Sequence, residues 1–197
     1  MTAPAPLPEI TTPQLVLRAA EPALAASVAE FYRRNREAHA RWNPTLPEAM
    51  FTLDGQRERL AETAASIESG ASIAWWLFAP DAPEHAIGLI HLSQIARRAF
   101  HNAMLAYAID TAHEGRGLMA EALEAALADA FSPRVNLHRV QANVRPENSR
   151  SLALLARLKF EREGLAREYL FIEGAWRDHV LTALRNPTWA VGLQPVE

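Results

Sequence analysis

The chain has 197 residues, of which 49% are hydrophobic and 22% charged, which is enough apolar content for one globular domain with a substantial core. Its 20 Lys and Arg against 23 Asp and Glu give a formal net charge of −3, which excludes the basic surface typical of sequence-independent nucleic-acid binding. The absence of cysteine excludes disulfides, thiolate metal sites and a cysteine nucleophile. No apolar run approaches the roughly 18 residues of a membrane span, so we expect a soluble, cytoplasmic protein with no membrane partner.

The N-terminal segment, residues 1–13, contains four prolines and lacks the charged and apolar regions of a signal peptide. We interpret it as a flexible or extended leader. Residues 14–190 are assigned to a single domain and residues 191–197 to a tail.

The first half of the domain alternates short strands with helices. A strand is predicted at 14–18, a helix opening at Pro22 and running to 36, and a loop at 35–47 that contains Trp42. Trp42 either lines a substrate site or packs onto the core beneath the loop. A polar helix follows, capped by Asp54 and ended by Gly70.

Three strands with turns between them are predicted next, forming a meander at residues 72–78, 86–95 and 103–109. Trp75 and Trp76 are adjacent and therefore face opposite sides of their strand, so we expect one in the core and the other in surface packing.

A glycine-rich turn, residues 113–117, joins the third of these strands to a helix predicted from Leu118 to about 131. Gly115 and Gly117 permit positive φ and close approach of a ligand. The first N–H groups of the helix have no intrahelical partner and lie at the positive end of its dipole, which favours a phosphate group. The alternative is that the glycines only make a tight connection.

The next strand, 137–144, completes a β-α-β unit, and such a crossover requires parallel strands. A helix at 149–158 follows, in which Ser151 takes the place of an apolar residue on the stripe of Leu154, Leu155 and Leu158. Its hydroxyl either bonds a backbone carbonyl nearby or serves a function. Residues 160–172 and 176–184 are predicted to form a hairpin.

The glycine-rich turn, Asn143, and the run from Asn148 to Phe160 (NSRSLALLARLKF) resemble the GCN5-related N-acetyltransferases, or GNAT enzymes. The closing segment EGLAREYLFIEGAWRDHVLTAL is similar to that of the ribosomal-protein-alanine N-acetyltransferases of the RimJ type. The resemblance covers residues 86–190 well, and before that it extends to the order of elements.

The resemblance implies an α+β fold with one mixed, mostly antiparallel sheet of about seven strands flanked by helices, whose central parallel pair is splayed to hold acetyl-CoA. It implies that pantetheine lies between these two strands, that the N–H near Ile109 meets the thioester carbonyl, and that Asn148 reaches the pantetheine arm. Ser151 would donate a proton to the departing thiolate. The CoA pyrophosphate would be bound by backbone N–H groups at Glu114, Gly115, Arg116, Gly117, Leu118 and Met119.

The chemistry implied is direct attack by an amine on acetyl-CoA, with Glu168 as the candidate base. Glu168 is alternatively an ordinary charged residue on a strand edge. The sequence departs from the family pattern at Ala112, where a Gln or Arg is common, at Leu155, where a Tyr often serves as acid, and at Lys159, where Gly is common. Arg116 and Arg150 either meet CoA phosphates or are surface arginines. Asp178 and His179 receive no role.

Three functions are therefore considered. The first is acetylation of the N-terminal α-amine of a protein, a ribosomal protein by resemblance; the second is acetylation of a small amine or antibiotic; and the third is a non-catalytic CoA-binding regulatory module. No histidine shows metal-ligand spacing, so no metal is expected. The acceptor and the oligomeric state are left open.

Overall fold

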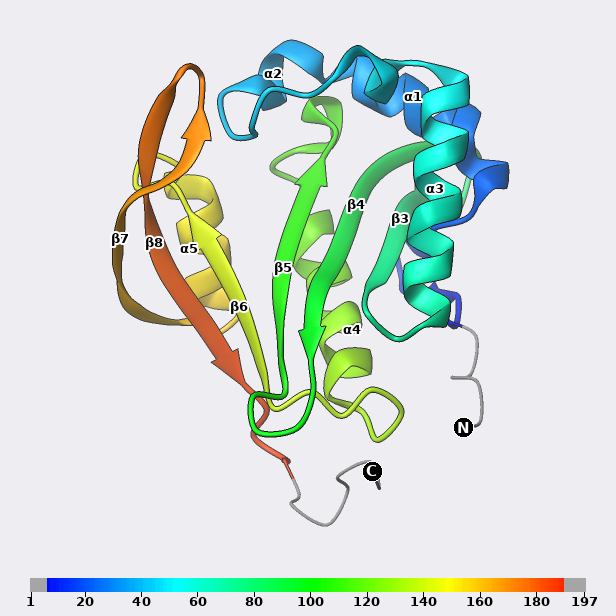
Figure 1. Cartoon of the computed structure of the whole chain (residues 1–197). Helices are drawn as coiled ribbons and strands as arrows, with labels where there is room; N and C mark the ends of the chain where they lie inside the picture. Colours follow the sequence, from blue (N-terminus) through cyan, green and yellow to red (C-terminus); the bar gives the residue numbers. More distant parts are fainter. Residues whose placement is uncertain (1–6, 190–197) are drawn as a thin grey trace.

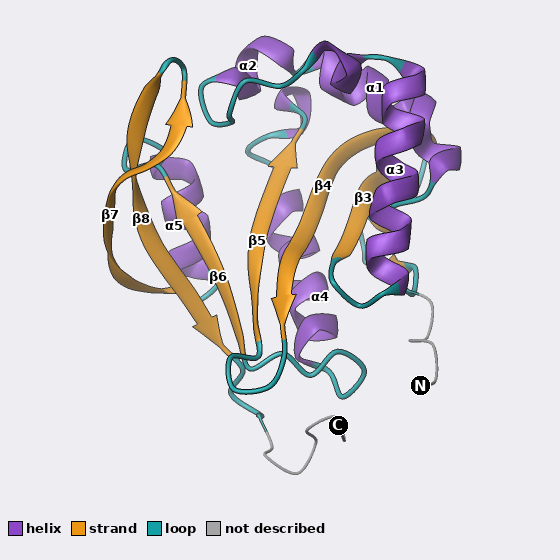
Figure 2. Cartoon of the chain, in the orientation of Figure 1, coloured by secondary structure: helices purple, strands orange, loops and turns teal. Residues whose placement is uncertain are grey.

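Eight strands form a single mixed sheet in the computed structural model, which describes residues 7–189 (Figures 1 and 2). The α+β architecture is confirmed, with one strand more than the seven expected. The spatial order is β1-β2-β3-β4-β5-β6-β8-β7, and all neighbours are antiparallel except β5 and β6. The strands are β1 (Ile10–Thr11), β2 (Val16–Ala19), β3 (Ile73–Ala79), β4 (Ala82–Ala96), β5 (Asn102–Ile109), β6 (Arg139–Val144), β7 (Glu161–Ile172) and β8 (Ala175–Arg185).

The additional strand comes from the segment that we assigned to the leader. Ile10 and Thr11 pair with Leu17 and Val16 of β2, so this part of residues 1–13 belongs to the sheet. Residues 1–6 of the proposed leader and the proposed tail at 191–197 lie outside the described residues. The domain boundaries stay a prediction.

Helices cover both faces of the sheet (Figure 1). On one face lie the N-terminal helices, and on the other lie α4 and α5, which contribute to the larger of two hydrophobic clusters. The helices are η1 (Pro22–Leu24), α1 (Ala25–Arg34), α2 (Arg36–Ala40), η2 (Glu48–Phe51), α3 (Leu53–Glu68), η3 (Thr111–His113), α4 (Leu118–Phe131) and α5 (Ser149–Arg157).

Two local predictions in the N-terminal half are wrong. The helix predicted from Pro22 to about 36 ends at Arg34, close to its expected end, but the loop predicted at 35–47 begins with the helix α2. The buried Asn35, whose side chain bonds Phe31 O, separates α1 from α2. The cap of α3 is Thr52 and not Asp54, since Thr52 Oγ1 accepts a hydrogen bond of 3.1 Å from Gly55 N–H.

Trp75 and Trp76 face opposite sides of β3, as predicted, but neither lies on the surface. Trp75 belongs to the cluster beneath α4, whereas Trp76 packs against Phe31 of α1 with 5.4 Å between ring centroids. Both are buried because β3 has helices on both of its faces. The expectation of surface packing is therefore wrong.

The parallel strands β5 and β6 separate along their length. They pair through three residue pairs only, Asn102–Arg139, Ala103–Val140 and Met104–Gln141, although β5 continues to Ile109 and β6 to Val144. Figure 1 shows the two strands diverging toward their C-terminal ends. The predicted splay is thus present. Beyond the three pairs, the backbone N–H and C=O groups on the facing edges of β5 and β6 do not bond to each other.

No helix within residues 7–189 combines the length and apolar character that crossing a bilayer requires.

Candidate active site

The glycine-rich turn carries a row of backbone donors. Gly115 and Gly117 have φ of 76° and 79°, and Gly117 is the N-cap of α4. The first helical bonds run from Ala120 and Glu121 N–H to Gly117 O, and within the described chain no acceptor is found for the N–H groups of residues 115–119. These donors lie at the positive end of α4, an arrangement suited to an anion.

A buried carboxylate holds this turn against the N-terminal helices. Asp110, at the end of β5, accepts hydrogen bonds of 3.0 and 2.9 Å from Arg34 and a third, of 3.0 Å, from Ala112 N–H. Asn35 reinforces the contact, because its side-chain oxygen accepts from Thr111 N–H at 3.0 Å. Burial alone would raise the pKa of Asp110, but these hydrogen bonds outweigh burial and hold the pKa below its usual value.

Asp110→Ala is expected to lower the free energy of unfolding by about 2 kcal/mol at pH 7, because it removes two hydrogen bonds of Arg34 and the acceptor of Ala112 N–H in the turn. Since the folded-state pKa is depressed, this stabilisation is fully present above the unfolded pKa of about 3.9 and is lost as the pH falls through the folded pKa. Urea unfolding of the unsubstituted protein and of Asp110→Ala between pH 7 and pH 3 measures the effect.

The exposed pair of Asp54 with Arg57 provides the control, since Asp54→Ala should change stability by less than about 0.5 kcal/mol. Equal losses for the two variants would contradict the assignment.

Glu114 and Arg150 form an ion pair that links the glycine-rich turn to the first turn of α5. The N–H of Glu114 already donates to Thr111 O, at 3.4 Å, so the free donors begin at Gly115. Arg116 is exposed, and no ion pair of its side chain is found within residues 7–189. Of the two arginines considered for phosphate contacts, Arg150 is thus held by an ion pair, whereas Arg116 is available to bind an anion.

The end of β5 forms one wall of the opening between the parallel strands. Asp110 N–H donates to Ile87 O of β4 at 2.8 Å, and because strand residues alternate in direction, Ile109 N–H points away from β4. His39 Nε2 lies 3.0 Å from Ile109 O, the carbonyl oxygen of the same residue. The N–H predicted to meet a thioester carbonyl thus lies on the side from which β6 has diverged.

Ser151 and Tyr107 form a hydrogen bond across the opening. Ser151 lies in the first turn of α5 and Tyr107 on β5, beyond the last residue that pairs with β6. Burial raises the pKa of Tyr107 to about 12, although its hydrogen bond with Ser151 acts in the opposite direction. The phenol therefore keeps its proton at neutral pH and can donate it to Ser151 Oγ, which leaves the Ser151 hydroxyl hydrogen available to another group.

Sequence reasoning did not identify Tyr107 as a site residue. It placed Tyr107 on one strand face with Leu105 and Ile109, and it noted Ser151 as a hydroxyl on an apolar helix stripe. Each is a polar group on an apolar face, and such groups need a partner when buried. A polar residue on the apolar face of a strand and another on the apolar face of a nearby helix are the signal from which their hydrogen bond could have been predicted.

Asn148 is the N-cap of α5, and its side-chain oxygen accepts a hydrogen bond of 3.1 Å from Ser151 N–H. This contact orients the first turn of α5, on which Ser151 lies. The side-chain NH₂ group of Asn148 has no acceptor within residues 7–189, so it is the group that a pantetheine contact would use first.

Glu168 is an exposed residue on β7 with a φ of 47°, within an irregular stretch of the strand. The next residue, Tyr169, accepts a hydrogen bond of 2.9 Å from Asn143 Nδ2. Asn143 lies on β6 two residues beyond Gln141, the last residue that pairs with β5. Glu168 is thus adjacent to a side chain that reaches the diverging part of β6.

A buried guanidinium lies at the wide end of the opening. Arg145, at the end of β6, bonds Arg41 O from the loop after α2, and Glu173 at the tip of the β7–β8 hairpin at 3.2 Å. Trp42 is half-buried, with the Arg145 guanidinium 5.6 Å from its ring centroid. Figure 1 shows α2 near the end of β5 and the tip of the β7–β8 hairpin beyond the end of β6, at the end of the sheet where the two strands are far apart. Trp42 therefore packs against charged groups beside the opening and not on the core.

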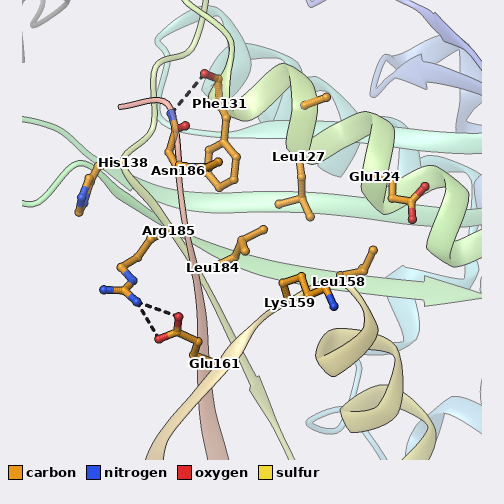
Figure 3. Close-up of a pocket in the computed structure, with 12 residues that line it drawn as sticks. Glu124, Leu127, Phe131, His138, Leu158, Lys159, Glu161, Leu184, Arg185 and Asn186 are labelled. Atoms are coloured by element: carbon orange, nitrogen blue, oxygen red, sulfur yellow. Dashed lines mark hydrogen bonds and ion pairs between the residues drawn. The ribbon is translucent and has the colours of Figure 1, made fainter. Parts of the chain in front are cut away.

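A groove of about 800 Å³ lies elsewhere, between α4, the end of α5 and the end of β8 (Figure 3). Its lining begins on α4 at Glu124 and includes Leu127, Phe131 and Leu184, and it contains none of the predicted site residues. Lys159, also in its lining, has a φ of 67°, which accounts for the glycine common at this position in the family. The groove is distinct from the opening between β5 and β6.

Within residues 7–189, no three His, Asp or Glu side chains gather in a way that could hold a metal ion.

The chain matches the acetyltransferase (GNAT) domain family over residues 14–161. It is 40% identical over 188 residues to the ribosomal protein uS5-alanine N-acetyltransferase of Escherichia coli, covering 95% of each chain. The ribosomal-protein-S5-alanine acetyltransferase from Vibrio fischeri has a similar structure, with a TM-score of 0.89 and 31% identity over 93% of this chain and 99% of that chain. RimJ from Mycobacterium smegmatis, solved in complex with CoA-disulfide, gives a TM-score of 0.82 and 26% identity over 91% and 87% of the two chains. The similarity extends over most of the length of each relative.

Proposed function

This chain belongs to the GNAT acetyltransferase family and is an N-acetyltransferase, and we propose that its acceptor is the N-terminal α-amine of a ribosomal protein that begins with alanine. The observation that carries this proposal is the 40% identity to the uS5-alanine enzyme across 95% of both chains. The same relatives provide no support for a non-catalytic CoA-binding module. A small amine as acceptor becomes an outcome of the test below.

Acetyl-CoA is the proposed acetyl donor, and two features of the chain support its placement. The free N–H groups of residues 115–119 offer donors to the pyrophosphate at the start of α4. The unpaired edges of β5 and β6 offer backbone groups to the amides of pantetheine, in the manner of an added strand. The relative from Mycobacterium smegmatis was solved with CoA-disulfide.

The proposed reaction is a direct transfer. The amine nitrogen forms a bond with the thioester carbon, and the carbonyl oxygen becomes negative beside Ile109 N–H. The carbon–sulfur bond then breaks, the sulfur takes a proton from Ser151, and Glu168 accepts the proton released by the amine, directly or through water. Glu168 then releases the amine proton to solvent and Ser151 takes one proton from solvent, so that both side chains regain their starting protonation, while Tyr107 keeps its hydrogen bond to Ser151 Oγ.

The test is an acceptor screen with purified protein and acetyl-CoA, measured as thiol release and as peptide mass. A peptide with the N-terminal sequence of uS5, beginning with alanine, should be acetylated at its α-amine. The same peptide already acetylated at its N-terminus but carrying an internal lysine is the control and should not react. Turnover of small amines without turnover of any α-amine peptide would overturn the proposed acceptor class.

A further inference from the structure

Glu168 occupies a backbone conformation that few residues other than glycine adopt. Its φ of 47° lies in the left-handed region, although β7 is otherwise an extended strand. Non-glycine residues in this region persist where the surrounding structure enforces the conformation, and they are concentrated at functional sites. At Glu168 the enforcing contacts come from Asp178 on β8 and, through the neighbouring Tyr169, from Asn143 on β6.

The irregularity is a β-bulge in the β7–β8 hairpin with two extra residues on β7. Ala166 pairs with His179 and Leu170 pairs with Arg177, so three residues of β7, at 167–169, face the single residue Asp178 of β8. Asp178 Oδ1 accepts a hydrogen bond of 2.9 Å from Glu168 N–H. A side chain thus supplies the acceptor that the regular ladder would have provided.

The following residue is held as well. Tyr169 accepts the hydrogen bond from Asn143 Nδ2, and its ring lies 5.3 Å from that of the buried His179. The two residues are fixed by contacts to different strands, Glu168 through its backbone N–H to β8 and Tyr169 through its side chain to β6. Together these contacts determine the direction in which the Glu168 side chain leaves the backbone.

We infer that Asp178 is a positioning residue, whose carboxylate holds the bulge in the one conformation that directs Glu168 toward the opening between β5 and β6. This inference rests on the proposed function, because it assigns Asp178 a role only through the base. Without the Asp178 acceptor, the peptide N–H of Glu168 can bond water instead, and the bulge can take other conformations. The base is then present but misplaced for part of the time.

A double-mutant cycle with the α-amine peptide separates this role from a structural one. Asp178→Ala is expected to lower kcat/KM for the peptide about tenfold, whereas Asp178→Asn, which keeps an oxygen acceptor, should lower it less than about threefold. In the Glu168→Gln background, Asp178→Ala should have less than about a twofold further effect, since the base it positions is already removed. The affinity for CoA should be unchanged in all variants.

Glu161→Ala is the matched control, because it removes a carboxylate from the same hairpin that pairs with Arg185 and does not contact the bulge. Thermal unfolding and CoA binding show whether each variant is folded. Equal tenfold losses from Asp178→Ala in both backgrounds, or no loss in the otherwise unchanged enzyme, would overturn the inference. Absence of α-amine acetylation by the unsubstituted enzyme would instead overturn the proposed function.

Discussion

Glu168→Gln is expected to lower kcat for the alanine-initiated peptide about 100-fold, while the KM for acetyl-CoA stays within about twofold. The substitution keeps the size of the side chain but removes its ability to accept a proton. The loss should be partly offset as the pH rises from 7 to 9, because an α-amine with a pKa of about 7.7 to 8.0 then loses its proton without a base. Steady-state kinetics across this range measure both effects.

Glu163→Gln provides the matched control for this prediction. Glu163 lies on the same strand as Glu168 and pairs with Arg139, at the end of the sheet where β5 and β6 are still joined. Its substitution should change kcat by less than about twofold. A loss below about threefold for Glu168→Gln would show that water, and not this carboxylate, takes up the proton.

Ser151→Ala is expected to lower kcat about 100-fold, and Tyr107→Phe about tenfold, with little change in acetyl-CoA affinity for either. The order follows from their places in the hydrogen-bond chain. In the proposed reaction Ser151 donates to the departing sulfur, whereas Tyr107, hydrogen-bonded to Ser151, would act by orienting it. Single-turnover measurements isolate the chemical step from product release.

The relative size of these two effects identifies the proton donor. If Tyr107→Phe costs more than Ser151→Ala, the phenol itself protonates the thiolate, and Ser151 only orients it. Leu152→Ala on the same helix is a control for packing, because Leu152 contacts the hydrophobic core but takes no part in the hydrogen-bond chain. Its effect should appear in thermal stability and not in kcat.

The predictions that succeeded rest on patterns that are local in sequence. Gly115 and Gly117 predicted positive φ and an exposed row of donors because glycine is the residue that adopts this conformation without strain. The splay between β5 and β6 was expected from family resemblance and not from the residues themselves. No property of Met104 or Gln141 indicates that their pairing is the last.

The site residues that were missed depend on contacts between distant segments. Tyr107 and Ser151 are 44 residues apart, and Asp110 meets Arg34 across 76 residues. Asp178 lies only 10 residues from Glu168, but its role depends on a bulge that shifts the register of the hairpin. Alternation in sequence predicts a regular strand, so a bulge of this kind has no pattern from which it could be read.

The failures at α2 and at the cap of α3 have a similar cause. Asn35 follows the last residue of α1, and its side chain donates to Phe31 O and accepts from Thr111 N–H. Thr111 lies in a turn beyond β5, so this contact is not visible in the local sequence. Thr52 and Asp54 are both acceptable N-caps by residue type. Which of them caps α3 depends on the position at which the preceding helix η2 ends.

The three residue pairs that join β5 to β6 divide the sheet into halves of five and three strands. Rotation of one half about this junction would change the spacing between the halves least beside Asn102 and most beside Ile109. Arg145 links the two halves at that far end, through Arg41 O on one side and Glu173 on the other. The short ladder and the guanidinium lie at opposite ends of the opening, and the Tyr107–Ser151 bond and the Glu114–Arg150 ion pair join the halves between them. Together these contacts hold the width of the opening, which in the proposed complex must match the thickness of a single extended chain.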